Sequence, residues 1–167
     1  MRKIILSGDI NEESFAEFCE QMDELENVPS GAKTDDIELV LNSTGGNALD
    51  AVAFMSRMRL SPCDVNVTVF GLAGSAAVLI LASGDYRRMT QESWVMVHED
   101  SASYRAVTTS QLEKEAIMAR KFEDQWDEIM ERVSGTKKDV WKELHRNGDL
   151  YLTPKECVSL GICDEVV

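Results

Sequence analysis

The sequence predicts an α/β fold built on a parallel sheet, and two observations support this class. Short apolar or alternating runs typical of strands recur over residues 4–6, 36–42 and 65–70. Each run is followed by a segment in which apolar residues recur at helical spacing. Strands that alternate with helices form parallel sheets with right-handed crossovers. The 167 residues, 44% of them hydrophobic, are enough for one domain with a full core.

In the N-terminal half, the first strand ends at Ser7-Gly8, and Asn11 can cap the helix that follows. One face of that helix carries apolar residues at helical spacing: Phe15, Phe18, Met22 and Leu25. The second strand leads into the turn Ser43-Thr44-Gly45-Gly46-Asn47. A helix is expected after this turn, from about residue 48 to residue 59.

The next stretch joins a strand to a buried helix. Residues 65–70 alternate as a half-buried strand does, and residues 73–82 are nearly all apolar, which predicts a helix buried on most sides. Ser75 lies in the first turn of this expected helix, and Gly71 and Gly74 allow the chain to turn sharply before it. Ser75 therefore has two interpretations, a helix cap, which is common for serine, or an exposed nucleophile.

The C-terminal half contains a long charged helix, expected over residues 110–133. About 24 residues give a length of about 36 Å, more than the core of this domain needs. The helix is either an arm used in assembly or an ordinary helix packed along the domain edge. The polar residues 101–109 before it can form a strand or an ordered loop. Shorter elements are expected at 86–90, 94–98, 136–146, 149–153, 154–160 and 162–167.

Charge and composition exclude several classes of function. The 17 Lys and Arg against 30 Asp and Glu give a net charge of −13, which disfavours nucleic-acid and anionic-membrane partners. The apolar run at 4–6 is too short for a signal peptide or a membrane span, so the cytoplasm is the expected location. The four cysteines show no CxxC or Cys/His clustering, and we expect no disulfide framework, no metal and no cofactor.

Three polar residues form a candidate catalytic set. His98 ends an apolar strand, and Asp149 follows a turn; alone, each is more often structural, and Ser75 alone is more often a cap. His145, the second of two histidines, is expected to be solvated on a charged helix face. A serine on a tight strand-to-helix turn, a histidine at a strand end and an aspartate at a turn are together what a Ser-His-Asp triad requires.

At these residues the sequence resembles ClpP, the proteolytic subunit of the Clp protease, over nearly the whole chain. Four motifs carry the resemblance in the same order and spacing. The glycine turn 42–46 is similar to the family's Asn-Ser-Pro-Gly-Gly, residues 71–75 to Gly-x-Ala-Ala-Ser, and residues 96–98 to Met-Ile-His. Asp149, ahead of Tyr151-Leu152-Thr153 and Leu160-Gly161-Ile162-Cys163-Asp164, resembles the family's Asp, its Phe-Leu-Ser strand and its Ala-Gly-Leu-x-Asp ending.

The resemblance implies a crotonase-like fold, a superhelix of repeated ββα units with a protruding handle helix. It implies one domain over residues 1–167, with a head of residues 1–98 and 136–167 and a handle of about 99–135. It also implies a homo-oligomer, expected as a seven-membered ring or stacked rings.

The activity implied by the resemblance is that of a serine endopeptidase acting on peptides or unfolded chains inside the ring. The catalytic residues would be Ser75, His98 and Asp149. The oxyanion would be bound by the backbone N–H groups of Gly46 and Ala76. The peptide would lie along Gly45, Gly46 and Asn47 on one side and along the segment after His98 on the other.

The sequence departs from the family pattern at two places that bear on partners. Glu38 and Val40 occupy positions where the family has aromatic residues that dock an unfoldase, and the chain begins almost directly at the family's first core strand. We therefore expect no unfoldase docking in the usual way. Residues 99–104 replace the Gly-Gly strand that lines the substrate cleft and helps to join two rings in the family.

Three functions from different classes remain open. The first is an ATP-independent serine peptidase. The second is a catalytically silent assembly or scaffold component, for example one associated with a phage head, since some phages encode short peptidases of this kind. The third is an acyl-CoA enzyme, because the related crotonase fold also uses paired backbone N–H groups, but this function leaves the Ser-His-Asp set without a role.

Overall fold

The computed structural model describes residues 2–27, 36–99, 108–146 and 148–167. Over these residues strands and helices alternate as the sequence predicts, and the α/β class is confirmed. The elements are β1 (Arg2–Ile10), α1 (Glu12–Glu26), β2 (Ile37–Gly46), α2 (Ala48–Arg59), β3 (Val65–Gly74), α3 (Ala77–Ala82), β4 (Arg87–Met89), β5 (Trp94–Val97), α4 (Thr109–Ser134), α5 (Lys138–His145), β6 (Leu150–Leu152), α6 (Pro154–Ser159) and β7 (Glu165–Val166).

The strands form one sheet whose pairing is almost entirely parallel. Strands β1, β2, β3, β4 and β7 follow one another in this order, each parallel to its neighbour. Strand β5 pairs in parallel with the C-terminal end of β3, and β6 pairs with β5 in the antiparallel direction. The ends of β2, β3 and β5 therefore lie at the same edge of the sheet.

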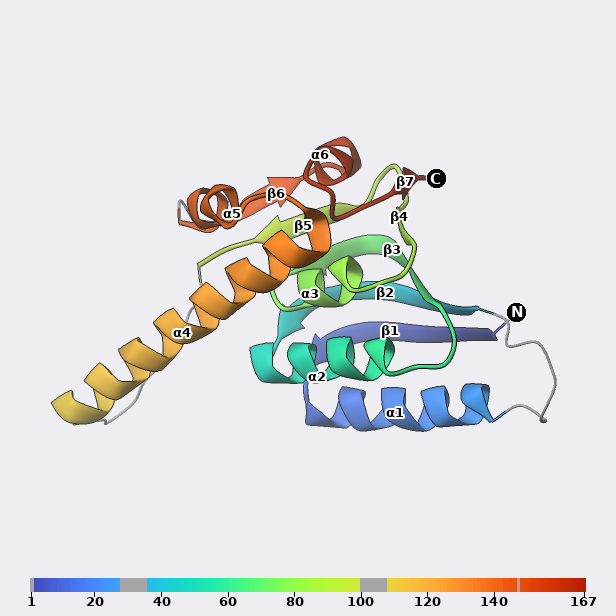
Figure 1. Cartoon of the computed structure of the whole chain (residues 1–167), viewed down its shortest axis with the longest axis horizontal. Coiled ribbons are helices and arrows are strands. Elements are labelled where there is room, and N and C mark those ends of the chain that lie inside the picture. The colour runs from blue at the N-terminus through green and yellow to red at the C-terminus, as the bar shows by residue number, and fades with distance from the viewer. Residues whose placement is uncertain (1, 28–35, 100–107, 147) are drawn as a thin grey trace.

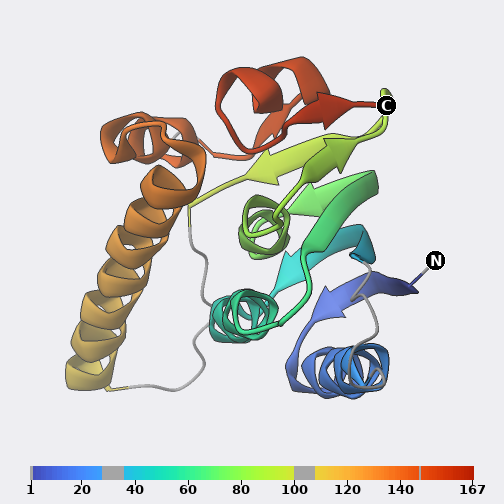
Figure 2. The same ribbon diagram turned by 45° about the vertical axis from the view of Figure 1, so that its right-hand side comes forward.

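Helices α1, α2 and α3 pack along one side of this sheet (Figures 1 and 2). In β1, Ile4 and Leu6 are buried toward these helices while Ile5 is exposed, as the two-residue period of a strand requires. Phe54 of α2 joins α1 to α2, because its ring lies 5.3 Å from that of Phe15 and 4.9 Å from that of Phe18. The apolar spacing in α1 thus defines its buried face, as expected.

The boundary between β3 and α3 differs from the expectation. Strand β3 continues to Gly74 instead of ending near residue 70, and α3 begins at Ala77 instead of residue 73. The added residues pair with β5, with Ala73 opposite Val95 and Gly74 opposite Met96. This pairing outweighs the weak strand preference of alanine and glycine. All six residues of α3 are buried, as expected.

The long helix α4 packs on the domain with one end and projects with the other (Figure 1). It has 26 residues, and its C-terminal half carries the buried residues Asp127, Ile129 and Met130. Its N-terminal half exposes Leu112 and Ile117. One half of α4 is thus packed on the domain and the other projects from it, whereas the use of the projecting half in assembly stays a prediction. Of the expectation for residues 101–109, the part up to residue 107 lies outside the described residues.

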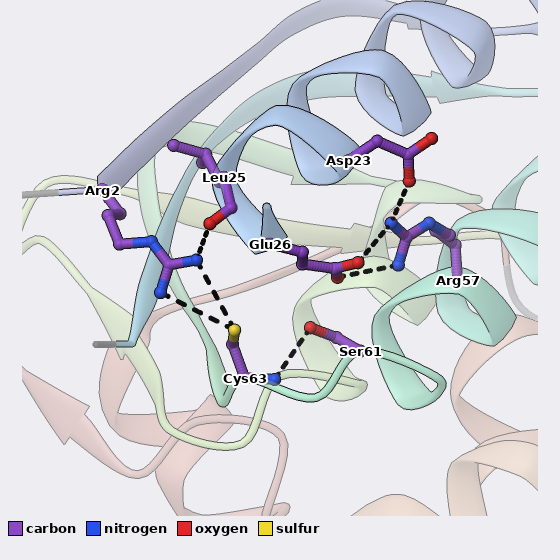
Figure 3. Close-up of polar contacts among 7 residues, drawn as sticks. All are labelled: Arg2, Asp23, Leu25, Glu26, Arg57, Ser61 and Cys63. Atoms are coloured by element: carbon purple, nitrogen blue, oxygen red, sulfur yellow. Dashed lines mark hydrogen bonds and ion pairs between the residues drawn. The ribbon is translucent and has the colours of Figure 1, made fainter. Parts of the chain in front are cut away.

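Two arginines join β1, α1 and α2 at the N-terminal end of the sheet (Figure 3). Arg57 binds both carboxylate oxygens of Glu26, at 2.9 and 2.8 Å, and contacts Asp23 at 2.7 Å. The hydrogen bonds from Arg57 hold the pKa of Glu26 below its usual range. Arg2 donates to the Leu25 carbonyl and lies 3.6 Å from the sulfur of Cys63. These contacts fix the end of α1 against the segment after α2.

Arg87 joins β4 to the C-terminal part of the chain. Its guanidinium binds both carboxylate oxygens of Asp164, at 2.9 and 2.6 Å, and donates to the Gly161 carbonyl at 2.7 Å. The hydrogen bonds from Arg87 lower the pKa of Asp164. Since a lowered pKa means that folding favours the ionised carboxylate, this pair stabilises the fold above the unfolded pKa and less so as pH falls.

We expect Asp164→Asn to lower the free energy of unfolding by about 1–2 kcal/mol at pH 7, because charge-assisted hydrogen bonds to Arg87 are lost. The difference from wild type should be smaller at pH 3, below the usual pKa of an aspartate, because the unfolded chain then gains a proton that the Arg87-paired carboxylate resists. Urea unfolding of both proteins at the two pH values measures this, with the exposed Asp139→Asn as the control. An equal difference at pH 7 and pH 3 would contradict the assigned role of the pair.

Candidate active site

Three strand ends bring the candidate residues together. The strands β2, β3 and β5 are parallel neighbours, so the features at their ends meet. These are the glycine turn at the end of β2, Ser75 just after β3 and His98 just after β5. Ligands of open parallel sheets bind outside the carboxyl ends of strands. The alternation of strands and helices in the sequence thus places residues far apart in the chain at one edge.

Ser75 is held in an unusual backbone conformation. Its φ is 51°, and no other non-glycine residue in the described part of the chain has a positive φ. Its N–H donates to the Met96 carbonyl at 2.7 Å, which ties it to β5. The N-cap of α3 is Ala76, without a side-chain cap hydrogen bond. The cap interpretation of Ser75 is therefore wrong, and its hydroxyl is directed elsewhere.

The Ser75 hydroxyl contacts His98. Ser75 Oγ and His98 Nε2 lie 2.7 Å apart, within hydrogen-bond distance. The backbone strain of a serine at positive φ costs of order 1–3 kcal/mol. This geometry supports a hydroxyl that can transfer its proton to the imidazole.

The glycine turn packs too closely against Ser75 at Gly45 and against β1 at Gly46 for any side chain. A Cβ on Gly45 (φ +107°) would lie 2.8 Å from Ser75 Cβ, and a Cβ on Gly46 (φ +150°) would lie 2.2 Å from the Ile10 carbonyl oxygen. Ser43, which is buried, fixes the turn from inside: its Oγ donates to the Gly8 carbonyl at 2.5 Å and accepts from the Gly45 N–H at 3.0 Å. Both glycines are therefore structural requirements at this place.

We expect Gly46→Ala to destabilise the protein by about 2–4 kcal/mol, because the backbone must move to admit the Cβ. Gly8→Ala is the matched control, since Gly8 also has positive φ (+102°) but has no atom within 4 Å of an added Cβ. It should cost only about 1–2 kcal/mol of backbone strain. Denaturant unfolding of both variants tests the comparison, and equal losses would contradict the close approach at Gly46.

Asn47 fixes the start of α2. Its side-chain Oδ1 accepts from the N–H groups of Leu49 and Asp50, at 2.8 and 3.1 Å. Its own N–H donates to the Ile10 carbonyl, and its carbonyl accepts from Ala51. Asn47 is an expected substrate-binding residue, but its side-chain oxygen, its N–H and its carbonyl all form hydrogen bonds within the chain.

Asp149 lies beside His98 in the sheet. Val97 pairs with Leu150 in the antiparallel ladder of β5 and β6, so the next residues outward are His98 and Asp149. Asp149 is exposed, and among the residues that the structure describes no hydrogen bond joins it to His98. The structure therefore contains the Ser75–His98 contact of the candidate triad and places the third member next to it without a bond.

A cavity of about 100 Å³ opens beside Ser75 and His98. Six structural parts contribute to its wall: the end of β2, the start of α2, the turn before α3, the end of β5, α4 and α5. The residues are Gly46, Ala48, Ser75, Ala76, Val97, His98, Phe122, Glu123, Trp126 and His145. Gly46 and Ala76, expected as oxyanion donors, both line it.

His145 is buried, and the expectation that it is solvated is wrong. It is 6% exposed, and its Nε2 lies 3.0 Å from Oδ1 of Asp127, which is 1% exposed. Trp126 covers this pair, and its ring centroid lies 5.7 Å from the centroid of the His145 imidazole. Burial raises the pKa of Asp127, and the hydrogen bond from His145 opposes this effect. The reason for the error is that α5 turns Trp141 and His145, one helical turn apart, toward α4.

With this geometry in view, comparison with protein families gives a clear result. The family model for Clp protease matches residues 1–167, the whole chain. The chain belongs to the Clp protease family. The resemblance seen in the four motifs is thereby confirmed.

The fold is also that of a solved family member. ClpP1 from Listeria monocytogenes, solved in a mutant form, superposes with a TM-score of 0.87 at 20% sequence identity. The match covers 99% of this chain and 91% of that chain. At this identity the likeness concerns the fold, and it confirms the ClpP-type architecture predicted from the sequence.

The described ranges contain neither a metal-binding group of side chains nor a helix suited to span a membrane. No group of three or more His, Cys, Asp or Glu side chains there is arranged to hold a metal ion. None of the helices in the same ranges has both the length and the apolar composition that a membrane span needs.

Sequence reasoning missed three residues around the site: Ser43, Asp127 and His145. Ser43 was part of the recognised turn, but its bond to Gly8 depends on the neighbouring strand. Asp127 is one of 30 acidic residues and stands in a helix rich in charge. For His145 there was a usable signal, its position one helical turn after Trp141.

Proposed function

We propose that this protein is a ClpP-like serine endopeptidase that cleaves peptides or unfolded polypeptides through an acyl-enzyme. The observation that carries the proposal is the 2.7 Å contact between Ser75 Oγ and His98 Nε2, at a serine of positive φ beside two glycines. Strain of this kind at a polar residue is typical of active sites. Membership of the Clp protease family supports the same reaction class.

In the proposed reaction, Ser75 Oγ attacks the peptide carbonyl carbon while its proton passes to His98 Nε2. His98 then gives this proton to the leaving amine nitrogen as the C–N bond breaks. Water then attacks the ester carbon while one of its protons passes to His98, and His98 returns this proton to Ser75 Oγ as the C–O bond breaks and the carboxylic acid leaves. Asp149 accepts a hydrogen bond from Nδ1 of His98 and stabilises the imidazolium, which requires it to move from its exposed position onto the ring.

The developing oxyanion would be bound by the backbone N–H groups of Gly46 and Ala76. Losing one such donor typically costs about 10²–10³ in turnover. The peptide would run along Gly45 and Gly46, with Asn47 holding the start of α2 in place. The opposite side of the cleft would come from the segment after His98, of which residues 100–107 lie outside the described part of the chain.

We further propose that the chain forms a homo-oligomer, a seven-membered ring or stacked rings. Each subunit would be a single domain with a head and a handle. The projecting half of α4, with Leu112 and Ile117 exposed, supports an assembly role for the handle. Unfoldase docking of the usual kind is not expected, because Glu38 accepts hydrogen bonds from Arg88 and Thr68 where the family has an aromatic residue. The expected location is the cytoplasm, without nucleic-acid or membrane partners.

One observation favours the second candidate, a catalytically silent scaffold: Asp149 is exposed and makes no hydrogen bond to His98 among the described residues. A protein of this kind would assemble without hydrolysis. The third candidate, an acyl-CoA enzyme, would leave the Ser75–His98 contact unused and is ranked last.

A substrate panel separates the three candidates. We expect the wild-type oligomer to hydrolyse short fluorogenic peptides without ATP and to leave acyl-CoA thioesters intact. A sizing column run in parallel reports the assembly. Hydrolysis of the thioester alone would support the acyl-CoA enzyme, and a well-folded oligomer that hydrolyses neither substrate would support the scaffold.

A further inference from the structure

The cavity beside Ser75 contains a buried polar group that the proposed reaction does not use. His145 lines this cavity, is 6% exposed, and comes from α5, whereas the catalytic residues follow β3 and β5. Its Nδ1 is buried and has no hydrogen-bond partner within the described residues. Leaving such a nitrogen unpaired costs about 1–3 kcal/mol. Because this nitrogen has almost no exposed surface, a ligand in the cavity must shift the imidazole to supply the missing partner and recover part of this cost.

The proton shared by Asp127 and His145 determines whether Nδ1 accepts or donates. If Asp127 is ionised, its Oδ1, 3.0 Å from His145 Nε2, accepts the proton of Nε2, and Nδ1 of the neutral ring is an acceptor. If Asp127 is protonated, which burial favours by raising its pKa, its hydroxyl donates to Nε2 and Nδ1 carries the proton. A group that has both a donor and an acceptor fits beside Nδ1 in either case.

Charge and shape narrow the choice further. The described residues of the cavity wall include no Lys or Arg, and Asp127 contacts His145 at Nε2. No cation of this wall would therefore neutralise an acidic side chain. Phe122, Trp126 and Val97 make much of the wall apolar, which suits an aliphatic stem and disfavours a fully charged end. A side-chain amide combines an aliphatic stem with an uncharged donor and an uncharged acceptor.

We propose that His145, held by Asp127, makes this cavity a binding site for an amide side chain, such as glutamine, on the residue whose carbonyl Ser75 attacks. His145 is then a specificity-determining residue. The inference rests on the proposed peptidase function, because the amide belongs to the substrate residue whose carbonyl Ser75 would attack. Binding of a peptide end to the cavity can nevertheless be measured without any turnover.

The test uses the full-length Ser75→Ala protein and product-like peptides that differ only in their last residue, glutamine, leucine or glutamate. Titration calorimetry gives their dissociation constants. We expect the glutamine peptide to bind about 3–10-fold more tightly than the leucine peptide, the value of one net hydrogen bond, and the glutamate peptide to bind most weakly. Equal binding of all three, or a preference for leucine, would overturn the inference.

Two further variants test whether the preference for glutamine depends on His145. His145→Leu removes the hydrogen-bonding imidazole and should reverse the order of glutamine and leucine. Asp127→Asn removes the negative charge, and its amide can donate to Nε2, which moves the proton to Nδ1. Binding of the glutamate peptide should therefore improve in this variant, a gain that a merely structural role of the pair does not produce. An unchanged order of the peptides in both variants, with thermal unfolding confirming the fold, would contradict the inference.

The same peptide series, extended by a fluorogenic leaving group, separates this inference from the proposed function. If wild type hydrolyses none of the substrates while Ser75→Ala still prefers glutamine, the peptidase proposal fails and the binding site stands. If wild type hydrolyses the glutamine and leucine substrates with equal kcat/KM and Ser75→Ala does not discriminate, the peptidase proposal stands and the amide site fails.

Discussion

Replacing Ser75 with alanine is expected to reduce kcat for peptide hydrolysis by about 10⁶-fold, the loss typical of removing a catalytic serine. The Ser75 Oγ that lies 2.7 Å from His98 Nε2 is the atom that would form the acyl-enzyme, and alanine has no atom to replace it. Peptide affinity should change little, since the cavity wall remains. Steady-state kinetics with a fluorogenic peptide, together with calorimetric binding, measure both quantities.

Ser75→Gly serves as the matched control for backbone effects. It also lacks the hydroxyl and should be equally inactive, but glycine adopts the φ of 51° without strain. We expect it to be about 1 kcal/mol more stable than Ser75→Ala. Activity above about 1% of wild type in either variant would contradict the assignment of Ser75 as the nucleophile, given the loss expected from removing it.

The second large effect is expected at Asp149. If this carboxylate engages Nδ1 of His98 during the reaction, Asp149→Asn should lower kcat by about 10⁴-fold, because an amide stabilises neither the required tautomer nor the imidazolium. The variant should fold and assemble as wild type does, since Asp149 is exposed. Steady-state kinetics and a sizing column test both expectations.

Asp139→Asn is the control for this prediction, because Asp139 is an exposed aspartate in the first turn of α5. It should retain wild-type activity. If wild type is active and Asp149→Asn retains its full turnover, Ser75 and His98 would work as a dyad, and the role of Asp149 in the proposed mechanism would be wrong.

Much of the fold was predictable because its signals are local. The alternating residues of β2 and β3 and the apolar face of α1 at Phe18 and Met22 depend on spacing alone. The extension of β3 to Gly74 was not predictable from propensity, since it arises from pairing with β5. Local patterns describe elements, whereas their lengths depend on neighbours.

The candidate site was predictable to the extent that its residues stand at element boundaries. Ser75 and His98 follow strands that turn out to be parallel neighbours, so their contact follows from the topology. The pair of Asp127 and His145 escaped prediction, because its burial results from α5 packing on α4. Whether Asp149 reaches His98 depends on a side-chain position that no spacing specifies.

The most direct test of an activated serine is covalent labelling with a fluorophosphonate, followed by intact mass and peptide mapping. The proposed mechanism predicts one adduct per wild-type chain, located on Ser75, and none on Ser75→Ala. An assembled, well-folded wild-type protein that takes up no label, or takes it up at another residue, would contradict the proposal that Ser75 and His98 form a working catalytic pair.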